Sequence, residues 1–223
     1  MIHLLQRFEK ITRRRYSLLA VASSLSIIWF ILTISTIANY PSPMHDEVIW
    51  IGIARQFLAQ GNFGWSSIPD LFGLHQNTTF VGRLFVLYIA VAFKLFGFGL
   101  LQARWALAVV SFACAILLGL SLQRLYSAWT GLLGAALYLF SWNTFYFSHY
   151  VRPEMLGLLG GLGLLYWFIC THNTASSVTV VGWGLLNSLM LDTHFSYAHL
   201  LVALDLVIII DALRRKSLGR IGW

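Results

Sequence analysis

The feature that most constrains this chain is a series of apolar blocks, each about 20 residues long, the length a helix needs to cross a bilayer. Hydrophobic residues make up 58% of the 223 residues and charged residues only 10%. A soluble domain carries roughly 25% charged residues, so this chain has too few to cover a water-facing surface. We therefore predict an all-α, polytopic integral membrane protein.

The apolar blocks predict a single transmembrane domain over residues 1–223, with about six membrane-spanning helices. Residues 39–99 form a first external loop that contains two shorter apolar segments, 45–60 and 80–96. We expect both segments to be helices that lie in the membrane interface, ended by Gly61 and by the glycines that follow residue 96. The predicted spans lie at about 16–38, 102–122, 130–149, 154–171, 178–194 and 197–213.

The basic residues predict the orientation of these spans. Residues 7–15 and 214–220 are rich in Lys and Arg and flank the first and last spans, and such clusters mark the cytoplasmic side. We expect both termini in the cytoplasm, and we attribute the net charge of +7 to topology rather than to nucleic-acid binding. Snorkelling to water is one explanation for external Arg55 and Lys94, and a further use for the external basic residues stays open. The five basic residues left outside are Arg55, Arg83, Lys94, Arg104 and Arg152.

Most other ionisable residues gather on the external side of this topology. They come from separate stretches of chain and can converge only if the spans form a bundle. Charged groups at membrane depth are candidates for function, so we predict a polar cleft at the outer face. The external set comprises His45, Asp46, Glu47, Asp70, His75, Arg83, His149, Arg152, Glu154, Asp192, His194 and His199.

Two of these clusters also have structural explanations. Asp46 is a good N-cap and Glu47 favours the helix dipole at the start of segment 45–60. Pro153 and Glu154 fit the first turn of the span that follows residue 153. Arg152 is harder to explain structurally, because a guanidinium binds phosphate oxygens in a bidentate manner.

The remaining acidic positions carry weaker signals. Asp192, His194 and His199 have metal-binding side chains without a recognisable ligand motif, so a hydrogen-bonded polar turn explains them better. Asp205 lies in the middle of a span, where an ionised carboxylate is costly. We expect it to be protonated or to make a polar contact inside the bundle.

The order of these features resembles the N-terminal region of the GT-C membrane glycosyltransferases. The resemblance rests on an external acidic pair DE, a glycine-ended amphipathic helix, the runs FKLFGFGLLQARWALAVV and LQRLYSAWTGLLGAALY, and an external RPE. More narrowly, the chain resembles dolichyl-phosphate-mannose protein mannosyltransferases and bacterial aminoarabinose transferases of lipid A. The resemblance covers essentially all of the chain, while members of the family are about twice as long.

The resemblance implies site residues. Asp46, with Glu47 beside it, matches the family's first external acidic position, and Glu154 matches the second. The lysine motif that opens the second surface helix in bacterial members is missing, and Arg83 or His75 stands in its place. The residues implied for the phosphate of the donor are Arg83, Arg152, His75 and His149.

The implied reaction is transfer of a sugar from a polyprenyl phosphate to a lipid, glycan or protein acceptor at the external face. Asp46 would be the general base, and a single displacement would invert the anomeric carbon. Cationic side chains, or a divalent metal, would stabilise the leaving phosphate. A polymerase or ligase that uses the same donor stays open, as does a non-enzymatic transporter subunit or scaffold.

Overall fold

The computed structural model describes residues 2–65, 82–171, 177–193 and 197–221, and this part of the chain is helical without a strand. The all-α prediction is confirmed for these residues. In chain order the helices are α1 (Ile2–Thr36), α2 (His45–Gln60), α3 (Arg83–Phe96), α4 (Leu100–Leu125), α5 (Ala128–Phe140), α6 (Trp142–Ser148), α7 (Glu154–Thr171), α8 (Ser177–Thr193) and α9 (Ala198–Ile221).

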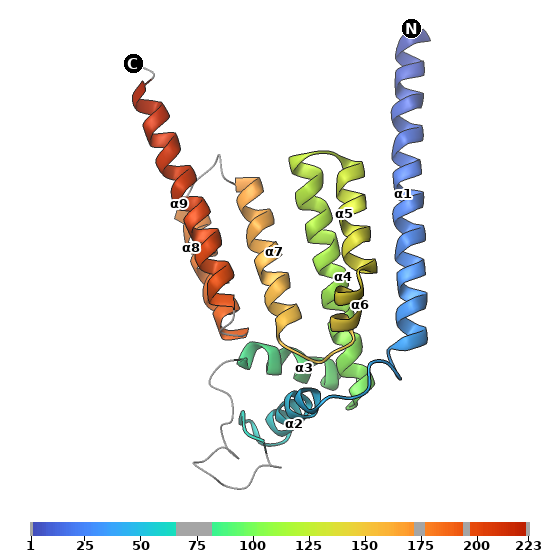
Figure 1. The fold of residues 1–223 in the computed structure, drawn as a ribbon, viewed down its shortest axis with the longest axis vertical. Coiled ribbons are helices and arrows are strands. Elements are labelled where there is room, and N and C mark those ends of the chain that lie inside the picture. The colour runs from blue at the N-terminus through green and yellow to red at the C-terminus, as the bar shows by residue number, and fades with distance from the viewer. Residues whose placement is uncertain (1, 66–81, 172–176, 194–196, 222–223) are drawn as a thin grey trace.

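The helices have two orientations (Figure 1). Helices α1, α4, α5, α7, α8 and α9 run roughly along one direction, and α2 and α3 lie across one end of them. The start of α1 and the end of α9 lie at the opposite end. Helix α4 is central, because it packs against α2, α3, α5, α6 and α7.

In the described part of the chain, three helical segments are long and apolar enough to cross a membrane: Tyr16–Thr36, Leu100–Leu125 and Glu154–Thr171. Ala128–Phe140 and Ala198–Ile210 are apolar but shorter. The protein thus has several helices suited to a bilayer, in agreement with the membrane prediction. The predicted span at 154–171 coincides with α7.

Helices α2 and α3 match the two short segments predicted from the sequence. Helix α2 ends at Gly61, which has φ 74° and whose N–H donates to the carbonyl of Phe57. Helix α3 ends at Gly97, with φ 88° and an N–H that donates to Phe93. Positive φ is favourable only for glycine, so these two residues stop the helices where expected.

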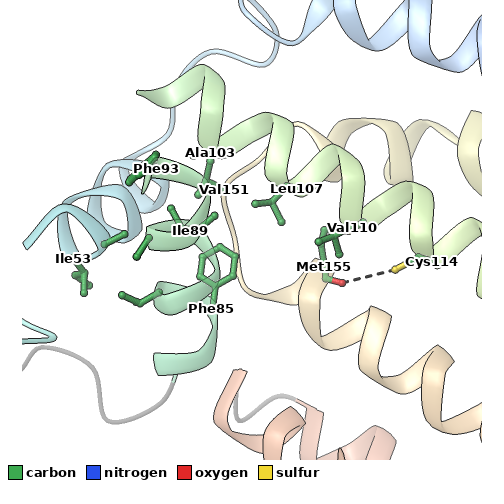
Figure 2. Close-up of a cluster of buried hydrophobic side chains, with 13 residues drawn as sticks. Ile53, Phe85, Ile89, Phe93, Ala103, Leu107, Val110, Cys114, Val151 and Met155 are labelled. Atoms are coloured by element: carbon green, nitrogen blue, oxygen red, sulfur yellow. Dashed lines mark hydrogen bonds between the residues drawn. The ribbon is translucent and has the colours of Figure 1, made fainter. Parts of the chain in front are cut away.

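The largest buried cluster joins α2 and α3 to the bundle (Figure 2). Ile53 of α2 and Phe85 and Ile89 of α3 meet Leu107 of α4 there, and Met155 brings in the start of α7. Because these side chains are almost fully buried, the two crosswise helices are fixed on the end of α4. This packing positions the start of α2, where the acidic pair lies.

Two predicted details of the bundle have different outcomes. The span predicted over 130–149 is divided into α5 and α6 at Ser141, whose hydroxyl accepts from the N–H of Thr144 at 3.3 Å. Asp205 of α9 accepts from the indole N–H of Trp183 at 2.7 Å and from the amide of Asn187 at 3.3 Å. The predicted polar contact of Asp205 inside the bundle is therefore confirmed.

Candidate functional site

The candidate site lies at the end of the bundle where α2 crosses it. Three parts of the chain meet there: the first turn of α2, the start of α4, and the turn of residues 149–153 between α6 and α7. Helix α2 begins at His45 with Met44 in the N-cap position. The expectation that Asp46 is the N-cap is therefore wrong, and Asp46 is the second residue of the helix.

The centre of this region is a fully buried ion pair between Glu47 and Arg104. Arg104 donates from Nε to Glu47 Oε1 at 3.0 Å and from Nη2 to Oε2 at 2.8 Å. The same guanidinium donates to the carbonyls of Ile37 at 3.1 Å and Pro41 at 2.9 Å. Bidentate geometry and the extra acceptors offset the cost of removing both charges from water.

Glu47 receives two further hydrogen bonds from the backbone. The N–H of Met44 donates to Oε2 and the N–H of Val151 to Oε1, both at 3.1 Å. One carboxylate thus links the segment after α1, the start of α2, helix α4 and the turn before α7. Both its oxygens are occupied, so in this arrangement Glu47 holds the site together and has no lone oxygen facing solvent.

Asp46, Arg152 and Glu154 form a second cluster, which faces outward. Arg152 Nη2 lies 2.5 Å from Glu154 Oε1, and its Nε lies 3.8 Å from Asp46 Oδ2. The Asp46 side chain is 50% exposed, whereas those of Arg152 and Glu154 are 34% and 35% exposed. The structure therefore brings together three of the predicted site residues, with one cation between two carboxylates.

A pocket of about 350 Å³ adjoins this cluster, lined by side chains from α5, α6 and α7 and by Tyr197 just before α9. Arg152 and Glu154 form part of its wall, together with Asn143 and Thr144. The Tyr197 hydroxyl donates to the backbone carbonyl of Glu154. Glu154 Oε2 is buried with no hydrogen-bond partner among the described residues.

His149 lies close to the cluster in sequence but points into the protein. Its Nε2 is 3.1 Å from the Thr36 hydroxyl, and its Nδ1 is 2.7 Å from the carbonyl of Phe145. The buried ring ties α1 to α6 and is poorly placed for a donor phosphate.

The other predicted positions are dispersed. Arg83 is exposed at the start of α3, with its guanidinium carbon 5.5 Å from the centre of the Phe63 ring. Asp192, at the end of α8, accepts from the N–H of Leu84 at 2.7 Å and from that of Gly82, so it caps α3. The structural, hydrogen-bonded role predicted for Asp192 is thus confirmed, although this residue lies in helix α8 rather than in a turn. The positions Asp70, His75 and His194 lie outside the described residues.

Sequence reasoning missed two residues of this region. Arg104 was only counted among external basic residues, although a charge inside the apolar run that starts α4 needs a partner. Tyr197 carried no signal, since aromatic residues are common throughout the chain. Within the described residues no group of three or more His, Cys, Asp or Glu side chains is placed to hold a metal ion.

Comparison of the chain with protein-family models, curated proteins and solved structures gave no match.

Proposed function

We propose that this chain is a membrane glycosyltransferase of the GT-C type, which transfers a sugar from a polyprenyl phosphate to an acceptor. In this proposal the long helices make six crossings, with α5 and α6 together forming one of them. The termini are cytoplasmic, and α2 and α3 lie in the external interface. The observation that carries the proposal is the convergence of Asp46, Arg152 and Glu154 beside an open pocket.

Asp46 is the proposed general base. It is half-exposed at the start of α2, and Glu47 next to it fixes that start through the buried pair with Arg104. The carboxylate takes the proton of the acceptor hydroxyl as the acceptor oxygen attacks the anomeric carbon. The bond from that carbon to the phosphate oxygen breaks, and the lipid phosphate leaves with the electron pair.

Arg152 is the proposed partner of the leaving phosphate, because a fixed positive charge stabilises the anion that develops in the transition state. Its guanidinium has five N–H donors, and two of its nitrogens face Asp46 and Glu154. Glu154 holds the guanidinium in place through its Oε1. Arg83, the first residue of α3, is a further candidate to bind the donor phosphate. His75 is a candidate for the same role from the resemblance alone.

The test is sugar transfer by the intact gene product in membranes, with Asp46→Asn compared with the wild type. A general base contributes roughly 100- to 10,000-fold in rate, so we expect a loss of that size with unchanged amounts of membrane-inserted protein. His45→Gln is the matched control, because His45 is exposed in the same helix turn and its only described ring contact is with Trp65.

Near-normal transfer by Asp46→Asn combined with abolished transfer by Glu154→Gln would assign the base to Glu154. No transfer by the wild type from any polyprenyl-phosphate sugar, with normal insertion, would favour the transporter or scaffold alternative.

A further inference from the structure

The outer surface of α4 has two apolar hollows that the proposed transfer reaction does not use. The first, of about 510 Å³, lies between α3 and α4 and is lined by Tyr88, Leu95 and Leu101 among others. The second, of about 400 Å³, lies between α1 and α4. Trp105 and Val109 line both hollows, so the two adjoin along one face of α4.

The length of these hollows along α4 corresponds to the thickness of one leaflet of a bilayer. Their lining on α4 runs from Leu101, next to the crosswise α3, to Phe112. At a rise of about 1.5 Å per residue this stretch is about 16 Å long. One leaflet contributes about 15 Å to the hydrocarbon core. An acyl chain that entered at α3 would therefore reach its end near the bottom of the hollows.

Two exposed cations are close in the chain to residues of the first hollow, or contact the link that joins its two helices. Lys94 is next to Leu95, which lines the hollow. The guanidinium carbon of Arg55 is 5.1 Å from the centre of the Phe98 ring, in the link between α3 and α4. Among the described residues neither cation has an acidic partner. Both belong to the external basic residues that orientation of the spans does not require.

We propose that this surface is a binding site for one anionic phospholipid from the leaflet on the α3 side. Its phosphate contacts Lys94 and Arg55, and its two acyl chains occupy the two hollows on either side of Trp105. A second protein helix would fill the apolar surface but would leave the cations without a counter-charge. An anionic lipid with two acyl chains fits the two hollows, matches their length along α4 and supplies a negative charge for the two cations.

The experiment is titration of the purified gene product with phosphatidylglycerol and, separately, phosphatidylcholine, with bound lipid counted by native mass spectrometry. We expect phosphatidylglycerol to bind more tightly. Each cation near an anionic lipid contributes enough to change affinity about fivefold. Arg55→Ala and Lys94→Ala should each weaken phosphatidylglycerol by about that factor, and leave phosphatidylcholine unchanged.

A second variant fills the hollows without changing charge. Val109 is 62% exposed and lines both hollows, whereas Val202 of α9 is 58% exposed and lines neither. Val109→Trp should remove tight binding of phosphatidylglycerol, and Val202→Trp should keep it. Arg124→Ala, at the other end of α4, is the matched control for charge. Thermal unfolding of each variant shows whether it is folded.

Equal affinity for the two phospholipids, or equal binding by all folded variants, would overturn the proposal. So would displacement of phosphatidylglycerol by polyprenyl phosphate together with loss of sugar transfer in Val109→Trp, because the hollows would then belong to the donor. If the phospholipid site is disproved, sugar transfer by the wild type is still expected. The tests of the phospholipid site and of the sugar transfer can therefore fail independently.

Discussion

Asp46 and Glu47 are adjacent carboxylates with opposite surroundings. Successive residues of a helix point about 100° apart, so the first turn of α2 can direct Glu47 to Arg104 and Asp46 to Arg152. Glu47 is fully buried with both oxygens bonded, and Asp46 is half-exposed. These two neighbouring carboxylates therefore have separate tasks, one in holding the site and one in the proposed chemistry.

Glu47→Gln is expected to destabilise the protein strongly. The substitution leaves the Arg104 guanidinium buried without a counter-charge, and removing one partner of a buried pair costs about 3–5 kcal/mol. Thermal or denaturant unfolding of purified protein in detergent measures the effect. Asp46→Asn, on the exposed side of the same turn, should change stability by about 0.5 kcal/mol or less. Equal stability of the two variants would show that the Glu47 pair contributes little.

Arg152→Ala is expected to impair use of the lipid-phosphate donor more than Arg152→Lys does. Lysine keeps the positive charge but loses the planar, bidentate donor arrangement of the guanidinium. The measurement is the dependence of transfer rate on donor concentration for both variants, with acceptor held in excess. Donor dependence unchanged from the wild type in both would assign Arg152 to a structural role, as the ion-pair partner of Glu154.

The sequence could identify these residues but could not fix where their side chains point. Asp46, Arg152 and Glu154 converge as the predicted external cluster requires, while His149 and Glu47 turn inward. That difference depends on the rotation of each helix about its axis and on partners distant in the chain. Arg104, for example, lies 57 positions from Glu47, and no local pattern connects them.

At the scale of elements, local stop signals determined which boundaries were predictable. The ends of α2 and α3 were found because glycine follows each one. The break between α5 and α6 was missed, because the apolar pattern continues across Ser141 and a serine inside an apolar run is not by itself a helix boundary. Ser141 both follows α5 and caps α6, a double role that appears only in three dimensions.

Close packing of α4 against α5 gives a prediction about glycine. A side chain at Gly131 of α5 would press on the backbone of Gly119 in α4, whereas nothing lies within 4 Å of a side chain added at Gly184 of α8. Gly131→Ala should therefore destabilise the protein by about 1–3 kcal/mol through overpacking. Gly184→Ala should be neutral or stabilising, by up to about 1 kcal/mol. Thermal unfolding in detergent compares them, and equal shifts would contradict the tight α4–α5 contact.

At the scale of the whole molecule, the number of crossings is harder to establish than the fold class. Composition alone indicates a helical membrane protein, because so few charges cannot cover a soluble surface. The count of six depends on the other helices, because within the described residues only three segments are both long and apolar enough to span on their own. Helix α8 has 17 residues, and α5 has 13 before the break at Ser141.

The arrangement of the ends supplies the test of this count. The start of α1 and the end of α9 lie at one end of the bundle, and α2 and α3 at the other (Figure 1). If the long helices cross a membrane, Asn62 just after α2 and Ser217 near the end of α9 must lie on opposite sides.

We expect Asn62→Cys to react with an impermeant thiol reagent in intact cells, and Ser217→Cys only after permeabilisation. Cys114 is buried, but Cys170 is exposed, so both substitutions are made in a Cys170→Ser background. Labelling of both positions from the same side would require an even number of crossings between them. It would exclude the six-crossing arrangement, in which five spans separate these two residues.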